Sequence, residues 1–200
     1  MTARDQMLAR VRSALGRSAN DPVPEAPPVR LHVPDISLAD RPAQFTHALT
    51  ALGGQVILPY SKEDVREAIK GIVRGRSVVT TEAGDARTAE VGINFADYAL
   101  ADTGSLVFLS ESHESRLISL LPPIHIAVIA RDKILSGLDE LFTIVPQPAA
   151  RSSSMVLITG PSRTADIEMR LVRGVHGPGE IHVIIVEDVT TSQGDASGET

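Results

Sequence analysis

The fold class is decided by residues 155–163, Met155-Val156-Leu157-Ile158-Thr159-Gly160-Pro161-Ser162-Arg163. Consecutive apolar residues are typical of a strand that is buried on both faces in a parallel sheet. The Gly-Pro-Ser turn indicates that this strand ends at Thr159, and we expect a helix over 164–173. Such a junction would present backbone N–H groups to an anion at the carboxyl end of the strand, and Arg163 adds a positive charge there.

Strand-like and helix-like segments alternate on both sides of this junction. A strand at 55–58, a helix that begins after Ser61 and a strand at 77–80 make one βαβ unit, and 155–186 reads as a second. This order predicts an α/β fold, with a parallel-rich sheet and helices on both faces. Two extended runs within 91–110 leave no room for a crossover helix, which predicts a local antiparallel excursion there. Further expectations are a helix ending at Gly53-Gly54, a strand at 125–129 and a short helix at 134–142.

Proline and charge patterns divide the 200 residues into four parts. Residues 1–17 read as an amphipathic helix, which we expect to pack on its own domain or on a second copy. Residues 18–35 are a proline-rich linker. Residues 36–187 form a single α/β domain, and residues 188–200 are a polar tail.

Composition excludes several classes of protein. A net charge of −6 argues against nucleic-acid binding, and the absence of cysteine leaves no thiolate to ligate an iron–sulfur cluster. No segment resembles a membrane span or a signal peptide, so we expect a cytoplasmic protein. The six histidines include no pair at a metal-binding helical spacing, and no metal site is predicted.

Polar residues gather after the apolar run at 155–159. Arg163 could bind a ligand or cap a neighbouring carbonyl, and Asp166 could serve as an acid or base or pair with Arg170 on a helix surface. The candidate ligand contacts are Gly160, Ser162, Arg163, Thr164 and Glu168, and the candidate catalytic groups are Asp166 and His176.

A second candidate is the turn Asp102-Thr103-Gly104, which has the form of half an aspartic-protease site. We reject a protease because the chain has one copy of this motif and its βαβ pattern does not suit that all-β fold. Either Asp102, the third candidate catalytic group, and Thr103 face a pocket, with Gly104 allowing close backbone approach, or Asp102 bonds its own backbone. His125, which opens a strand after Pro122-Pro123, is a further candidate ligand contact.

Three blocks of sequence carry a resemblance to a known family. Residues 101–107, 120–128 and 158–168, the last continued by Val175-His176-Gly177-Pro178, resemble the LUD domain of the lactate-utilisation protein C family. The resemblance implies a fold like that of ribose-5-phosphate isomerase, glucosamine-6-phosphate deaminase and the CoA-transferases. It also implies oxidation of L-lactate to pyruvate together with two partner proteins, in which iron–sulfur clusters are expected. The family often has Glu at the place of Asp102. The Asp102 side chain keeps the charge, but its carboxylate extends less far from the backbone.

Three functional hypotheses follow. In the first, the chain is a subunit of an L-lactate-oxidising complex that binds a small carboxylate at Arg163, with His176 or Asp166 as general base. In the second, it is a non-catalytic assembly or regulatory module that engages partners through its N-terminal helix. In the third, it is a stand-alone enzyme of the same fold that handles phosphosugars or CoA. A homo-oligomer is compatible with each of them.

Overall fold

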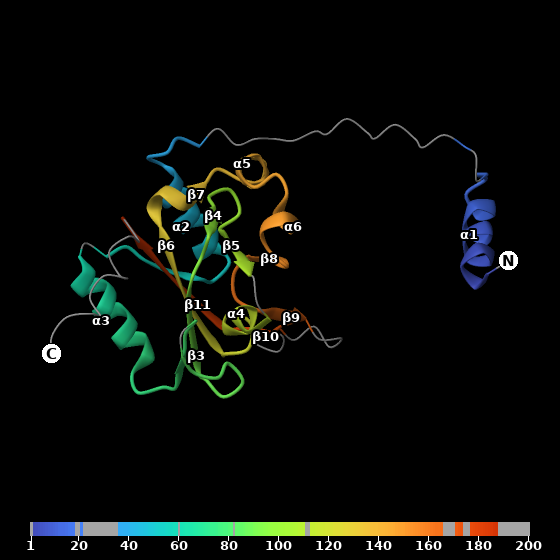
Figure 1. Cartoon of the computed structure of the whole chain (residues 1–200). Coiled ribbons are helices and arrows are strands. Elements are labelled where there is room, and N and C mark those ends of the chain that lie inside the picture. Colours follow the sequence, from blue (N-terminus) through green and yellow to red (C-terminus); the bar gives the residue numbers. More distant parts are fainter. Residues whose placement is uncertain are drawn as a thin grey trace. The chain divides into compact units, whose positions relative to one another are not determined.

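The computed structural model describes residues 2–18, 21, 36–59, 61–81, 83–110, 113–165, 171–173 and 177–187 (Figure 1). The chain divides into two units, Met1–His32 and Val33–Thr200. The first unit holds helix α1 (Ala3–Ala14), which begins with a capping box between Thr2 and Asp5 and has no buried residue. Most of the predicted linker and the whole predicted tail lie outside the described residues.

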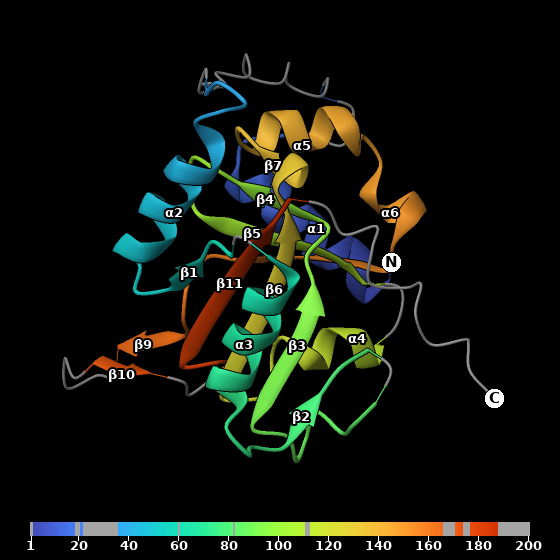
Figure 2. The same cartoon turned by 90° about the vertical axis from the view of Figure 1, so that its left-hand side faces the viewer.

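The second unit is built on a five-stranded parallel sheet, seen nearly face-on in Figure 2. Its strand order is β1-β11-β6-β3-β2, with all neighbouring strands parallel. The bounds are β1 Gln55–Ile57, β2 Val78–Val79, β3 Val91–Phe95, β6 Ile124–Ala130 and β11 Glu180–Val186. The predicted α/β class and parallel sheet are therefore confirmed. The first βαβ unit is also present, but its strands β1 and β2 lie at opposite edges of the sheet.

Helix α3 (Lys62–Val73) packs on one face of the parallel sheet. Ser61 caps it by accepting a hydrogen bond from the backbone N–H of Asp64 at 3.2 Å. Its apolar residues contact a buried cluster on β3, β6 and β11. Val65, Ala68, Ile69, Ile72 and Val73 make this contact.

A four-stranded sheet and helix α2 (Arg41–Ala51) cover the opposite face. The sheet order is β7-β4-β5-β8, with β4 Tyr98–Leu100, β5 Ser105–Ser110, β7 Ile134–Leu135 and β8 Ser154–Ile158. Strand β5 is antiparallel to both β4 and β8, which confirms the predicted excursion and extends it. Phe45 and Leu49 of α2 join the core between the two sheets. On its outer face the second sheet packs against α5 (Leu138–Ile144).

The remaining helices are short. Helix α4 (His113–Ile118) precedes β6, the 3-10 turn η1 (Arg131–Lys133) follows it, and α6 (Pro148–Arg151) precedes β8. The helix predicted at 134–142 was placed too early, because Ile134–Leu135 pair with β4 and Gly137 separates them from α5.

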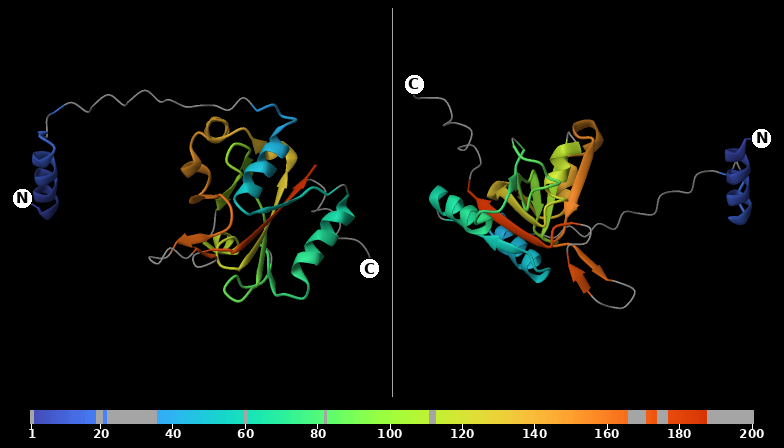
Figure 3. Two further views of the ribbon diagram at one scale, coloured as in Figure 1. Left: turned by 180° about the vertical axis from the view of Figure 1, so that it is seen from behind. Right: turned by 90° about the horizontal axis from the view of Figure 1, so that it is seen from below.

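The prediction of a second βαβ unit over 155–186 is wrong. Strand β8 belongs to the four-stranded sheet, and the chain after it forms a separate antiparallel ribbon of β9 (Arg163–Ala165) and β10 (Leu171–Arg173), visible in Figure 3. The helix expected over 164–173 is absent at both of its ends. An apolar run has the same appearance whether its strand is central or at an edge, so the sequence could not assign β8 to a sheet.

Glycine is required where β3 passes under α4. A β-carbon on Gly92 would overlap the carbonyl oxygen of Ile118. We expect Gly92→Ala to lower the free energy of unfolding by about 2 kcal/mol, because the packed backbone must shift. Gly71→Ala is the matched control: it lies in α3 with no atom within 4 Å of an added β-carbon. We expect that control to be neutral or stabilising by up to about 1 kcal/mol. Equal urea midpoints for the two variants would contradict this assignment.

Candidate functional site

The turn between β4 and β5 is held tightly on two sides. On one side, the backbone N–H groups of Ala101 and Asp102 donate to the carbonyls of Leu135 and Ser136, at 2.8 and 3.1 Å. On the other side, Gly104 has a φ of +68°, and a β-carbon there would lie 2.5 Å from the backbone nitrogen of Leu49 in α2. The close approach expected at Gly104 is therefore an approach to α2. We call residues 101–105 the β4–β5 turn.

Asp102 lies on the β7 side of this turn. Its Oδ2 atom is 2.7 Å from the position that a β-carbon on Gly137 would take, so the carboxylate rests against the backbone of Gly137. Its Oδ1 atom is buried and has no hydrogen-bond partner among the described residues. A buried carboxylate oxygen without a donor is unfavourable unless a proton or a ligand satisfies it. Asp102 thus has an oxygen atom that can accept a hydrogen bond from a ligand.

Three hydroxyl groups form a chain on the β8 side of the turn. The Ser105 Oγ atom lies 2.8 Å from Thr103 Oγ1 and 2.7 Å from Thr159 Oγ1. Ser105 is 3% exposed, whereas both threonines are exposed. We call Thr103, Ser105 and Thr159 the hydroxyl chain. It joins the β4–β5 turn to the end of β8, and its outer members can donate to or accept from a ligand.

The loop after β8 packs on the end of α2. Gly160 has a φ of +85°, and its α-carbon faces the side chain of Leu52. Arg163 Nη2 donates a hydrogen bond to the carbonyl oxygen of Leu52, the C-cap of α2. A guanidinium at this place satisfies a terminal carbonyl and the negative end of the helix dipole. The capping role that the sequence left open for Arg163 is therefore present, and it uses one of five N–H donors.

This geometry changes the electrostatics expected for the site. The prediction of helix N-terminal amides after Gly160-Pro161-Ser162 is wrong, because β9 begins at Arg163. The helix end that lies here is the C-terminal end of α2. An anion would therefore have to be held by Arg163 and by hydroxyl groups, not by a helix N-terminus.

The structure brings some predicted residues together and separates others. Thr103, Gly104, Gly160 and Arg163 all lie around the last turn of α2. Ser162 is near them in sequence, and its N–H donates to Pro178 O at 2.8 Å. Thr164 belongs to β9. Asp166, Glu168 and His176 lie outside the described residues, so their roles stay predictions.

His125 lies away from this surface, inside the molecule. It is 0% exposed on β6, with Nε2 2.8 Å from Asn94 Oδ1 on β3 and its ring 5.6 Å from that of Phe108. Its Nδ1 atom has no hydrogen-bond partner among the described residues. Burial lowers the pKa of His125 from 6.5 to about 4, so the ring is neutral at pH 7.

Sequence reasoning missed Ser105, Thr159 and Asn94. Ser105 and Thr159 are separated by 54 residues, and only the pairing of β5 with β8 brings their hydroxyls together. Asn94 did give a signal, since it is a polar residue inside the apolar strand Val91–Phe95. A buried amide of this kind normally has a polar partner.

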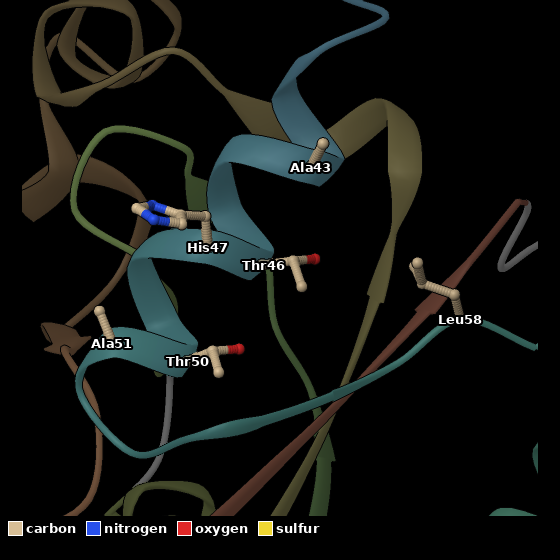
Figure 4. Close-up of a pocket in the computed structure, with 6 residues that line it drawn as sticks. All are labelled: Ala43, Thr46, His47, Thr50, Ala51 and Leu58. Carbon is tan, nitrogen blue, oxygen red and sulfur yellow. The ribbon is translucent and has the colours of Figure 1, made fainter.

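A shallow depression of about 630 Å³ lies elsewhere, on the outer face of α2 (Figure 4). Its lining residues are Ala43, Thr46, His47, Thr50, Ala51 and Leu58. The Thr46 hydroxyl donates to the carbonyl of Pro42 at 2.7 Å, which leaves few polar groups to orient a ligand. None of the predicted site residues lines it.

Among the residues that the structure describes, no group of three or more His, Asp or Glu side chains is arranged to hold a metal ion. No helix in the same residues is long and apolar enough to cross a membrane.

Comparison with known proteins identifies a LUD domain over residues 83–186, which include the β4–β5 turn, His125 and the β8 loop. "Lactate utilization protein C" of Halalkalibacterium halodurans is 42% identical over 107 residues, 52% of this chain and 46% of that protein. The protein of the same name from Bacillus licheniformis is 33% identical over 163 residues, 73% of this chain and 68% of that protein. The protein of the same name from Bacillus subtilis is 40% identical over 107 residues, 52% of this chain and 45% of that protein. The matched region thus spans about half the length of most of these relatives.

A solved structure shares the fold. The crystal structure of a DUF162 family protein from Deinococcus radiodurans superposes with a TM-score of 0.59 at 18% sequence identity. The match covers 75% of this chain and 98% of that chain. At this identity the likeness concerns the fold alone.

Burial of His125 predicts a pH dependence of stability. Because its pKa is about 4 when folded and 6.5 ordinarily, the unfolded chain binds the proton more tightly, and stability falls as the pH drops from 6.5 towards 4. Between pH 7 and pH 4.5 we expect the native protein to lose about 2 kcal/mol more than His125→Gln, whose amide can still donate to Asn94. His182, whose pKa burial also lowers, is common to both proteins. If the free energy of unfolding, measured in urea, falls equally with pH in both proteins, His125 is not responsible for the loss of stability.

Proposed function

Because the chain belongs to the LUD domain family, in the lactate utilization protein C group, we propose that it acts in L-lactate utilisation by holding a small carboxylate. The proposed site is the surface formed by the hydroxyl chain and Arg163. The observation that carries the proposal is the hydroxyl chain, which links two of the sequence blocks typical of the family at an exposed surface.

The chemistry of the ligand suits these groups. Lactate presents a planar carboxylate and a neighbouring hydroxyl, and pyruvate presents a carboxylate and a carbonyl. A guanidinium binds a carboxylate through two parallel N–H groups, and its bond to Leu52 fixes where the Arg163 head lies. The hydroxyls of Thr103 and Thr159 can then bond the oxygen on the adjacent carbon. Each ligand oxygen thereby has a partner of the right kind.

The proposed role of this chain is binding and orientation. Its 200 residues contain no cysteine, so the two electrons of lactate oxidation would pass through partner proteins that carry iron–sulfur clusters. Removal of the hydroxyl proton needs a base, for which Asp102, Asp166 and His176 are the candidates. Asp102 is supported by its buried Oδ1 atom, which has no hydrogen-bond partner among the described residues and can accept the hydroxyl proton.

Ligand affinity tests this site directly. Arg163→Lys keeps a positive charge that can bond the Leu52 carbonyl but lacks the planar fork, so we expect it to weaken lactate or pyruvate binding roughly 10-fold. Thr103→Val removes one hydroxyl and should cost a similar factor. Calorimetric titration of the purified chain with L-lactate, pyruvate, a sugar phosphate and CoA provides the measurement. Binding of a sugar phosphate or CoA in place of the carboxylates would favour a stand-alone enzyme instead.

The controls for this titration are exposed residues at other surfaces. Arg131→Ala removes an arginine that pairs with Glu187 at 2.9 Å, and Thr50→Val alters the depression on α2. Both should bind like the native chain. If Thr50→Val alone weakens binding, the ligand occupies the α2 depression and the proposed site is wrong.

Growth tests the biological role. In a strain that lacks the native gene, we expect Arg163→Ala to abolish growth on L-lactate while growth on glucose and the circular dichroism spectrum stay unchanged. Arg131→Ala should restore growth fully. Normal growth of the Arg163→Ala strain on L-lactate would overturn the assigned role of this arginine.

A further inference from the structure

Strand β8 is an edge strand of the four-stranded sheet. All five of its residues pair with β5 on one side, from Ser110↔Ser154 to Leu106↔Ile158. Among the described residues, no strand pairs with the side of β8 that faces away from β5. The right-hand view of Figure 3 shows the same strand, in orange, beside the four-stranded sheet. The other sheet-end strands β1, β2 and β7 are only two or three residues long.

This edge lacks the charged residues and the proline that usually protect an edge strand against pairing. Natural edge strands are blunted by charged residues, proline or bulges, because free backbone N–H and C=O groups recruit other strands. Residues 152–159, Ser-Ser-Ser-Met-Val-Leu-Ile-Thr, contain neither a charge nor a proline. Met155, Val156 and Ile158 are only partly buried, and Leu157 is 39% exposed. Four consecutive apolar residues therefore remain incompletely covered on both faces of the sheet.

We propose that β8 pairs antiparallel with β8 of a second copy about a two-fold axis, joining the two four-stranded sheets into one. A two-fold axis brings a strand against its own sequence, and here that sequence is neutral although the chain carries a net charge of −6. Self-pairing at this edge therefore sets no like charges opposite each other.

Side-chain alternation supports the same partner. Met155 and Leu157 lie on the outer face of the sheet, and Val156 and Ile158 on the inner face. In an antiparallel two-fold pair centred on Val156, Leu157 faces Met155 of the second copy on the outer face. Centred on Leu157, the pair sets Leu157 against itself and Val156 against Ile158. Both registers set apolar residues together at the centre of the pair, while Ile158 faces Ser154 in the first and Met155 faces Thr159 in the second.

The mass of the particle in solution tests this strand pairing independently of ligand binding. Leu157→Lys places a charge at the paired edge, and we expect it to raise the dimer dissociation constant roughly 100-fold. Sedimentation equilibrium over a concentration series should give the mass of two copies for the native chain and of one copy for the variant. Leu58→Lys is the matched control, since Leu58 is 54% exposed after β1 and should leave the dimer intact.

A second measurement keeps the test independent of how the lysine variant folds. Because the native chain has no cysteine, Leu157→Cys gives a single thiol at the edge. A bismaleimide should cross-link two copies of Leu157→Cys rapidly and two copies of Leu58→Cys poorly. A native chain that is a single copy at every concentration would overturn the proposal. So would a dimer that Leu157→Lys leaves unchanged, or hydrogen exchange showing that the β8 amides that face away from β5 are protected within a single copy.

Discussion

The structure of the candidate site depends on one steric constraint, the passage of the β4–β5 turn between two backbones. Gly104 lies against the backbone of α2 and Gly137 lies against the Asp102 carboxylate, and neither position has room for a β-carbon. The turn is consequently fixed on both sides at once. Thr103 and Ser105 then project towards β8, while Asp102 is directed to the segment after β7. The β4–β5 turn thus places polar groups against two neighbouring segments, the end of β8 and the segment after β7.

In the proposed site, Arg163 has two tasks. The C-terminal end of α2 contributes a negative partial charge beside the hydroxyl chain, which would repel a carboxylate. Arg163 offsets that charge through its bond to the Leu52 carbonyl and keeps further donors for a ligand. The proposed carboxylate site therefore rests on one guanidinium and on neutral hydroxyls. Because this site has a single positive charge, ligand affinity should depend more on Arg163 than on any other residue in it.

Much of the fold could be predicted from local patterns. The helix that begins after Ser61 and the excursion around Asp102-Thr103-Gly104 are encoded by residues close in sequence, and the structure confirms them. The helix expected over 164–173 and the sheet membership of β8 were wrong, because both depend on long-range pairing. The site was predicted in part: its motifs were visible, but the contact between Ser105 and Thr159 required knowing that β5 and β8 are neighbours.

The central claim is that a small carboxylate binds where the hydroxyl chain meets Arg163. Backbone amide chemical shifts of the labelled chain, recorded during titration with L-lactate and then with pyruvate, test it most directly. Binding at this site should give the largest shifts at Thr103, Ser105, Thr159 and Arg163, with saturation at a common ligand concentration. Shifts confined to the α2 depression, at Thr46, His47 and Thr50, would contradict it, as would no shift with either ligand.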